Sequence, residues 1–324
     1  MADFQLIRYD SSWKNRWDAF IEVSKNGTFL FKRDYMDYHS DRFKDNSLMF
    51  LLKNSIVALL PATSSDRMFS SHAGLTYGGL VMSRNITAVE VIEIFRLLMS
   101  YLSDNGFLKF IYKPIPHIYH EIPAEEDLYA LFRMNAALVA RGLSSAILQS
   151  DRLKFRNIRK YGIKKALKNG VVVEKSSDFS SFWKILETNL TERHGLLPVH
   201  NLEEITLLRN RFPNEINLYE AKIGEEVLAG VVVYNTKLVA HSQYIAASPK
   251  GRELGALDLI FDYLICNVYS ESRFFDFGIS TERDGWFLNE SLIYQKEGFG
   301  GRAICYDRYE IDVDKFNPFD MDPK

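Results

Sequence analysis

Polar residues that could bind or react gather near the end of the chain, between two apolar strands. The strand predicted over 273–279 runs into a polar loop, and the glycine turn 298–301 precedes the last strand. A loop that only connects two strands does not need so many polar and glycine residues, so we predict a site at a strand end. The candidate substrate-binding residues in this loop are Ser280, Glu282 and Asn289.

A second polar cluster lies in the strand predicted over 238–247. Alternation along a strand predicts His241 and Gln243 on one face and Ser242 and Tyr244 on the other. His241 could act as a general base, or it could be a hydrogen-bonded histidine of the core. Gln243 and Tyr244 are further substrate-binding candidates.

Asp276 lies in a strand otherwise made of apolar residues, where a carboxylate needs a partner. It could act as a base, or it could pair with an arginine and only hold the strand in place. Gly278 follows it, and a glycine at this point would let backbone or ligand approach closely.

Two histidines, His194 and His200, follow the helix predicted over 179–193. They are six residues apart and no cysteine or carboxylate cluster joins them, so we predict no metal site. This loop could contact a substrate, or it could be a plain helix terminus.

The segment 152–170 differs in composition, because it holds eight Lys or Arg residues and no acid. A broken apolar stripe runs through it, so we predict a basic amphipathic helix at a domain junction. It could bind the phosphates of a tRNA or of a nucleotide-linked molecule, or it could be a solvated helix face. Its candidate donor-binding residues are Arg156, Arg159, Lys160 and Lys164.

The elements that position these residues form two similar series. Residues 1–150 and 151–312 each run through antiparallel strands, a long helix, a strand, a short helix and further strands, and 313–324 is a tail. This order predicts an α+β fold with mixed, mainly antiparallel sheets flanked by helices, and not a doubly wound parallel sheet.

The run Lys296-Glu297-Gly298-Phe299-Gly300 has the pattern K-x-x-F-G, and a tyrosine-rich strand follows it. This part of the chain resembles the second half of the Fem-type aminoacyltransferases, which are two fused GNAT (N-acetyltransferase) domains. Ile158-Arg159-Lys160 is similar to the start of that second domain, and Tyr77-Gly78-Gly79 to a motif of the first. The resemblance covers most of 151–312 and implies two tandem GNAT-like domains.

The resemblance also implies a reaction, the transfer of an acyl or aminoacyl group to an amine. In that family the acceptor is a peptidoglycan precursor and the donor is an aminoacyl-tRNA. A lysine at the position of Lys296 would stabilise charge on the tetrahedral carbonyl oxygen, whereas a solvated loop lysine is the alternative. The predicted catalytic residues are Lys296, His241 and Asp276, and no metal is expected. Tyr77 and Lys113 would line an acceptor groove, or they would pack at an interface.

The donor carrier stays open between aminoacyl-tRNA and acyl-CoA. GNAT proteins that bind CoA carry R/Q-x-x-G-x-G/A where backbone amides hold the pyrophosphate. Here the stretch begins at Arg252 and keeps Gly255, but Leu257 replaces the second glycine. We therefore expect weak CoA binding at most. The alternative functions are an ordinary acetyl-CoA-dependent N-acetyltransferase and a non-catalytic module that binds a peptide, a sugar nucleotide or a partner protein.

Composition limits the partners. The 324 residues are long for one core, and a net charge of −2 means that a local patch must hold any anionic partner. No run of eighteen apolar residues and no apolar signal region occur, so neither a membrane span nor a secretory signal is expected. Cys266 and Cys305, expected to be buried, suit free thiols in the cytoplasm, with one disulfide as the alternative.

Overall fold

The computed structural model describes residues 4–316, apart from the side chains of residues 193 and 194. Most of the predicted tail, from residue 317 on, lies outside the described residues. The chain divides into two compact units: unit 1 is Met1–Gly142, Glu282–Phe287 and Cys305–Lys324, and unit 2 is Leu143–Thr281 and Leu288–Ile304. The sequence suggested one division near residue 150. Strands β8 and β16 each have residues in both units, and composition does not mark a division inside a continuous strand.

Unit 1 has strands of two sheets, and no strand pairing joins these sheets among the described residues. The first is antiparallel, in the order β1 (Phe4–Arg8), β2 (Leu48–Leu52), β3 (Ser55–Leu60) and β6 (Val81–Met82). The second runs in the order β4 (Thr63–Ser65), β5 (Met68–Ser70), β7 (Lys109–Tyr112), β16 (Arg302–Asp312) and β8 (Ala137–Leu148), and its β5–β7 pair is parallel. The helices of this unit are α1 (Lys14–Val23), α2 (Arg33–Met36), α3 (Ala88–Asp104) and α4 (Glu126–Arg133).

The long helix α3 shows why these segments fold as they do. Thr87 and Glu90 form a reciprocal capping box at its start. Its apolar stripe is buried as predicted, and it packs in a core with residues of β2, β3 and β7; the stripe is Val91, Ile94, Phe95, Leu98, Met99 and Leu102.

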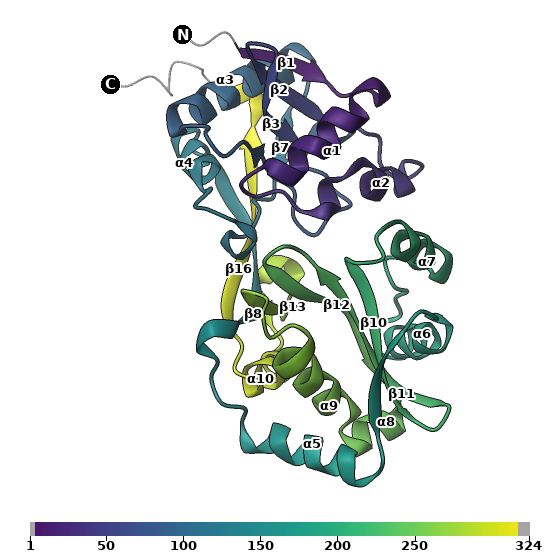
Figure 1. The fold of residues 1–324 in the computed structure, drawn as a ribbon. Helices are drawn as coiled ribbons and strands as arrows, with labels where there is room; N and C mark the ends of the chain where they lie inside the picture. The colour runs from purple at the N-terminus through teal and green to yellow at the C-terminus, as the bar shows by residue number, and fades with distance from the viewer. Residues whose placement is uncertain (1–3, 317–324) are drawn as a thin grey trace. The chain divides into compact units, whose positions relative to one another are not determined.

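Unit 2 holds one sheet in the order β8, β13 (Phe274–Ile279), β12 (Val239–Ala247), β11 (Glu226–Asn235), β10 (Ile216–Ile223) and β9 (Val172–Ser176). Only the β12–β13 pair is parallel. The helices α5 (Asn157–Lys168), α8 (Pro249–Leu254) and α9 (Ala256–Tyr263) lie on one side of it, and α6 (Ser180–His194) and α7 (Leu202–Arg211) on the other (Figure 1). The remaining elements are the π-helical turn Leu264–Val268, α10 (Glu290–Gly298) and the short ladder of β14 (Thr281–Glu282) with β15 (Phe287–Leu288).

Three elements differ from the sequence prediction. The glycine-rich run 74–81 is not a strand apart from its last residue, although it does make a close backbone approach, since a Cβ built on Gly78 would lie 2.1 Å from the carbonyl oxygen of Ser71. The two short strands predicted within 137–148 are the single strand β8. The helix predicted over 254–269 is interrupted at Gly255, which has a left-handed φ of 77° between α8 and α9.

Candidate active site

The site begins where two parallel strands separate. β12 and β13 pair only through Val239–Phe274, Ala240–Phe275 and His241–Asp276. Both strands lose regular geometry beyond this point. The β11–β12 register slips between Val232 and Val233, and the β13–β8 register slips between Asp276 and Ile279. Such irregularities redirect side chains and backbone groups, and here they open the sheet next to the polar cluster.

The slip in β12 corrects the predicted faces of that strand. His241 pairs with Tyr234 and Tyr244 with Val232, so both lie on one face, while Ser242 pairs with Val233 on the other. Gln243 is the extra residue of the bulge. Strict alternation predicted Tyr244 and His241 on different faces of the strand. That prediction is wrong because a bulge adds one residue, so the residues beyond it change faces.

Asp276 and His241 form a hydrogen-bonded pair. Asp276 is fully buried, and its Oδ2 lies 2.8 Å from Nδ1 of His241. Its Oδ1 accepts hydrogen bonds from the Ser144 hydroxyl and from the Gly278 amide, 3.2 Å away. These donors satisfy a carboxylate that would otherwise be costly to bury. With Nδ1–H donated to Asp276, Nε2 of His241 is the ring atom that can accept a proton.

Lys296 approaches the same point from α10. Its side chain is 5% exposed, and its Nζ donates to the carbonyl oxygens of Gly278 at 2.8 Å and Ile279 at 2.7 Å. Burial lowers the pKa of Lys296 to about 8, and the negative charge of Asp276 opposes that shift. The predicted alternative of a solvated loop lysine is therefore wrong. An ammonium has three donors, so the two carbonyls leave one for a ligand.

Gly278 is the point where these groups meet. Its φ is 76°, and a Cβ built on it would lie 3.3 Å from Cε1 of His241. The structure thus brings together His241, Asp276 and Lys296 around one glycine.

A cavity of about 260 Å³ lies beside this cluster in unit 2. Its walls come from β12, Phe277 of β13, α9 and α10, and Lys296 is among its lining residues. Ile245 and Ala247 of β12 share the α9 face with Ser242. The cavity therefore opens mainly on one face of the parted strands, and His241 lies on the other.

The two candidates at the interrupted helix have different surroundings. Arg252 lines the cavity, and its guanidinium donates to the carbonyl of Ala247 at 2.7 Å and the amide oxygen of Asn189 at 3.2 Å. Gly255 instead lies against α5, where a Cβ would be 2.6 Å from the carbonyl oxygen of Gly162. Gly255 thus has a packing role that the motif did not indicate.

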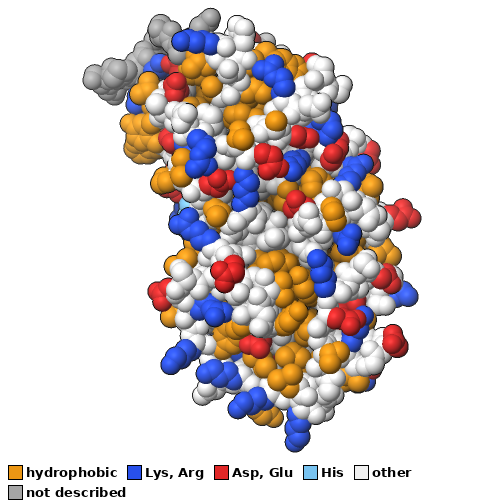
Figure 2. All heavy atoms as spheres, in the orientation of Figure 1, with side chains coloured by type: hydrophobic (Ala, Val, Ile, Leu, Met, Phe, Trp, Pro, Cys, Tyr) orange, Lys and Arg blue, Asp and Glu red, His pale blue; other side chains and the backbone are white. Residues whose placement is uncertain are grey.

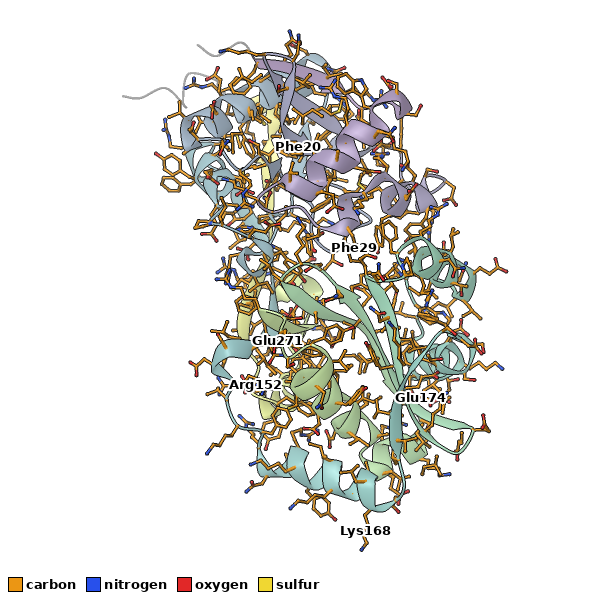
Figure 3. All side chains as sticks on the ribbon, in the orientation of Figure 1. Phe20, Phe29, Arg152, Lys168, Glu174 and Glu271 are labelled. Atoms are coloured by element: carbon orange, nitrogen blue, oxygen red, sulfur yellow. The ribbon has the colours of Figure 1, made fainter. Side chains whose placement is uncertain are left out.

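Basic residues in and just before α5 are divided between ion pairs and an open groove. Arg159 pairs with Asp258 at 2.7 Å, and Arg156 with Glu297 at 3.5 Å. Lys160 and Lys164 line a groove of about 480 Å³. Lys and Arg side chains follow the lower edge in Figure 2, where α5 lies, and Figure 3 marks the two ends of the basic segment, Arg152 and Lys168.

Three of the remaining candidates of unit 2, Tyr244, His200 and Asn289, have structural contacts. The hydroxyl of Tyr244 lies 2.5 Å from Nδ1 of His200, and both are buried. Asn289 caps α10 by accepting from the Leu292 amide at 3.1 Å. Ser280 is buried, and its hydroxyl makes no hydrogen bond within the part of the chain that the structure describes. The side chain of His194 lies outside the described residues.

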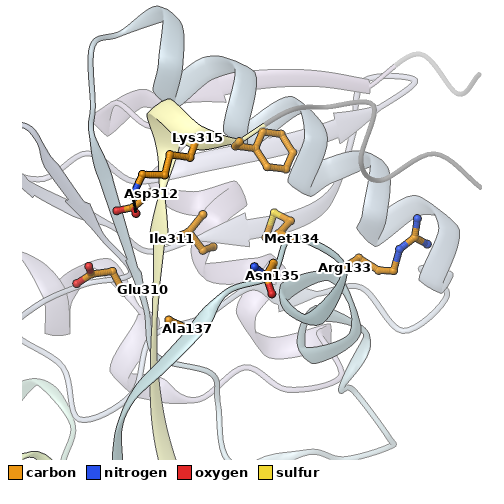
Figure 4. Close-up of a pocket in the computed structure, with 9 residues that line it drawn as sticks. Arg133, Met134, Asn135, Ala137, Glu310, Ile311, Asp312 and Lys315 are labelled. Carbon is orange, nitrogen blue, oxygen red and sulfur yellow. Dashed lines mark hydrogen bonds and ion pairs between the residues drawn. The ribbon is translucent and has the colours of Figure 1, made fainter.

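Three candidates belong to unit 1. Tyr77 is buried, and its hydroxyl bonds Thr28 at 3.2 Å. Lys113 donates to the carbonyls of Ala73 and Leu75, and burial lowers its pKa to about 8. Glu282 is exposed. A cavity of unit 1 lined by Met134, Asn135, Ile311 and neighbouring residues, shown in Figure 4, contains none of these candidates.

Both cysteines, Cys266 and Cys305, are free and exposed, so their predicted burial is wrong. Each cysteine lies on the exposed side of its helical turn or strand, and the apolar pattern of the sequence did not indicate that side. Among residues 4–316, no three His, Cys, Asp or Glu side chains are placed to hold a metal ion. No helix in this range has the length and hydropathy needed to cross a bilayer.

Sequence reasoning missed several residues of the site. Ser144 donates to Asp276 from the middle of β8. The sequence predicted two short strands there, with Ser144 in the gap between them. Asn189 and Gln295 line the cavity from α6 and α10, and helical spacing alone gave no signal for either. Only the pairing of distant strands brings them to one place.

Comparisons with known proteins bear on the fold and on the domain family. Residues 153–286 match the acetyltransferase (GNAT) domain family, and no curated protein matches the chain. The crystal structure of FemX has a TM-score of 0.66 at 10% identity over 95% of this chain and 97% of that chain.

Two further solved structures are similar. The C-terminal domain of a putative lysylphosphatidylglycerol synthetase from Agrobacterium fabrum has a TM-score of 0.54 at 11% identity, over 78% of this chain and 80% of that chain. A tandem GNAT protein from the clavulanic acid biosynthesis pathway has a TM-score of 0.51 at 9% identity, over 96% and 99%. These likenesses confirm the predicted fold, and the domain match confirms the predicted enzyme class. The chain has the tandem GNAT fold of FemX, and its residues 153–286 match the acetyltransferase (GNAT) domain family.

Proposed function

We propose that this protein moves an acyl or aminoacyl group from an activated carrier to the amine of a small peptide or nucleotide-linked acceptor, such as a cell-wall precursor. The observation that carries the proposal is the meeting of His241, Asp276 and Lys296 at Gly278, beside the cavity that β12 and β13 help to line. The proposed setting is the cytoplasm, where aminoacyl-tRNA and acyl-CoA are both present.

The opening between β12 and β13 suggests how the two substrates are arranged. The donor lies in the cavity on the α9 face, with its carbonyl oxygen toward the third donor of Lys296. The acceptor amine approaches from the face that carries His241. Each group then performs one task, and most of the rate gain comes from alignment and charge stabilisation.

The reaction proceeds by addition and elimination. The amine nitrogen attacks the donor carbonyl, and a C–N bond forms while negative charge develops on the carbonyl oxygen beside Lys296. Nε2 of His241 accepts the proton of the amine, and Asp276 stabilises the resulting imidazolium. The bond from carbonyl carbon to the carrier's oxygen or sulfur then breaks, and the proton passes to that leaving group.

The basic groove beside α5 bears on which carrier brings the acyl group. Lys160 and Lys164 line a groove with Arg152 and Lys154, and one acid, Asp262, shares it. This charge favours a carrier with phosphate groups, and the length of the basic segment favours a long polyanion such as tRNA over the compact CoA. If the carrier is tRNA, binding should weaken steeply with salt, because each neutralised phosphate releases counterions.

The test is a donor screen followed by charge reversal. Thermal shift and transfer assays with acyl-CoAs, an aminoacylated tRNA pool and nucleotide-linked cell-wall precursors should identify a carrier and an acceptor. The double variant Lys160→Glu, Lys164→Glu should then abolish tRNA binding. Lys184→Glu, a single substitution of the same kind at an exposed residue of α6, should have little effect.

Two results would redirect the proposal. Micromolar acetyl-CoA affinity that is indifferent to the α5 charges would favour an ordinary N-acetyltransferase. Tight binding of an acceptor, without transfer from any donor, would favour the non-catalytic binding module.

A further inference from the structure

The cavity beside Lys296 has an unusual balance of charge. Its polar lining residues are two cations, Arg252 and Lys296, and two amides, Asn189 and Gln295. Aspartate and glutamate are absent from the described residues that line it. The other lining side chains are apolar, among them Phe261 and residues of β12 and α10.

Nearby acids have other partners. Asp276 is fully buried and accepts from His241, Ser144 and Gly278. Asp258 is paired with Arg159 at 2.7 Å. A positive group entering the cavity would therefore meet two cations, and no carboxylate among the lining residues could neutralise it. Placing an unpaired charge in such surroundings is strongly unfavourable.

The apolar walls indicate what the cavity does favour. Leu257, Phe261, Phe277 and Phe299 line it together, so burial of an apolar chain is favourable there. The lowered pKa of Lys296 agrees that these surroundings disfavour positive charge. Because the donor carbonyl must lie near Lys296 in the proposed reaction, the group attached to that carbonyl lies in or at this cavity.

We infer that the transferred group is apolar and carries no positive charge beyond the carbonyl region: an aliphatic or aromatic acyl chain, or an amino acid with such a side chain. Lysyl, ornithyl and arginyl groups are rejected. This inference rests on the proposed acyl transfer and adds the class of group transferred.

The experiment compares donors that differ in one charge on the same carrier. Heptanoyl-CoA is matched with 6-aminohexanoyl-CoA, in which an ammonium replaces the last methyl group. A single tRNA acylated in turn with leucine, phenylalanine or lysine gives the comparison on that carrier. We expect kcat/KM for the apolar member to exceed that of the cationic member by about a hundredfold on the carrier the enzyme uses.

A variant tests whether the cavity is the cause. Gln295→Glu introduces a carboxylate into the lining and should reduce the discrimination by about tenfold or more. Gln5→Glu makes the same change at an exposed position of β1 and should leave it unchanged. The donor comparison on the natural protein needs no variant, so misfolding of Gln295→Glu would not decide the question.

The outcomes separate this inference from the proposed function. Equal or better transfer of the cationic donor overturns the inference and leaves acyl transfer intact. Unchanged discrimination in a folded Gln295→Glu variant also overturns it. Failure to bind or transfer any donor on either carrier overturns acyl transfer, and this inference with it.

Discussion

Lys296 has an environment unlike that of an ordinary surface lysine. It is 5% exposed, bonds two backbone carbonyls and lines the cavity. We expect Lys296→Ala to lower kcat by about a hundredfold to a thousandfold, the loss expected for one stabiliser of a developing oxyanion. Steady-state kinetics with the donor found by the screen gives the measurement. The control, Lys184→Ala on the exposed face of α6, should keep normal activity.

The same lysine predicts an alkaline limit to activity. Because the pKa of Lys296 is lowered to about 8, its positive charge disappears as pH rises through that value. Turnover should fall above about pH 8, and a rate that stays level to pH 10 would argue against a cationic role.

His241 and Asp276 should behave as one unit. We expect His241→Ala to lower kcat by about a hundredfold to ten-thousandfold, the range for loss of a general base. Asp276→Asn should lower kcat as well, because it removes the carboxylate that orients the ring through Nδ1. Asp276 is a positioning residue, so the double variant should be little worse than His241→Ala alone.

Additive losses in that double variant would contradict the pairing. Ser144→Ala removes only one of the donors to Asp276, so its effect should be much smaller.

The break between α8 and α9 explains a glycine that the sequence assigned to donor binding. Gly255 has a left-handed φ of 77°, and a Cβ there would come within 2.6 Å of the Gly162 carbonyl oxygen. Gly170 ends α5 with φ of 75° and has nothing within 4 Å of a built Cβ. Gly170→Ala should cost about 1–2 kcal/mol of unfolding free energy, from backbone strain alone.

Gly255→Ala should cost clearly more than Gly170→Ala, because the added methyl group also forces α5 away from α8. Urea unfolding of the two variants provides the comparison. Equal costs, together with lost donor affinity in Gly255→Ala only, would restore the donor-binding interpretation.

The order of elements could be predicted from the sequence because it depends on local patterns. The stripe of α3 and its cap at Thr87 are both visible in the residue order, and the structure has both. The bulge at Gln243 and the fusion of two short strands into β8 could not be seen, because each depends on partners far along the chain.

The same limit applies to the site. The K-x-x-F-G motif pointed to Lys296, and an acid in an apolar strand pointed to Asp276. Neither signal showed that Asp276 pairs with His241, because that contact needs the parallel alignment of β12 with β13. The basic segment revealed its charge, but not that Arg156 and Arg159 have carboxylate partners.

At the scale of the whole molecule, each unit contains a buried ionisable group with a shifted pKa, and the two shifts have opposite consequences. In unit 1, burial raises the pKa of Asp127 from 3.8 to about 7, while Tyr112 donates to it at 2.6 Å. Between these values only the unfolded chain is deprotonated at this residue. The folded state holds the extra proton, so the contribution of Asp127 to stability is lost as pH rises from about 4 to 7.

In unit 2 the sign is reversed. The pKa of Lys296 falls from 10.5 to about 8 on folding, so the unfolded chain holds the extra proton between these values. Stability from this residue therefore rises as pH increases from about 8 to 10.5. Lys113 contributes in the same direction in unit 1, and the lowered pKa values of His72 and His120 act at acid pH, so total stability alone cannot separate the groups.

Differences between variants and the natural protein isolate each group. Asp127→Asn keeps an acceptor for Tyr112 but cannot ionise, so its stability relative to the natural protein should increase between pH 4 and pH 7 and then level off. Lys296→Met removes the buried charge, so its relative stability should be greatest below pH 8 and decline toward pH 10. Denaturant unfolding of both variants at these four pH values measures the two differences. For either variant, a stability difference from the natural protein that does not vary with pH would contradict the prediction. It would show that burial does not shift the pKa of the replaced group in the folded protein.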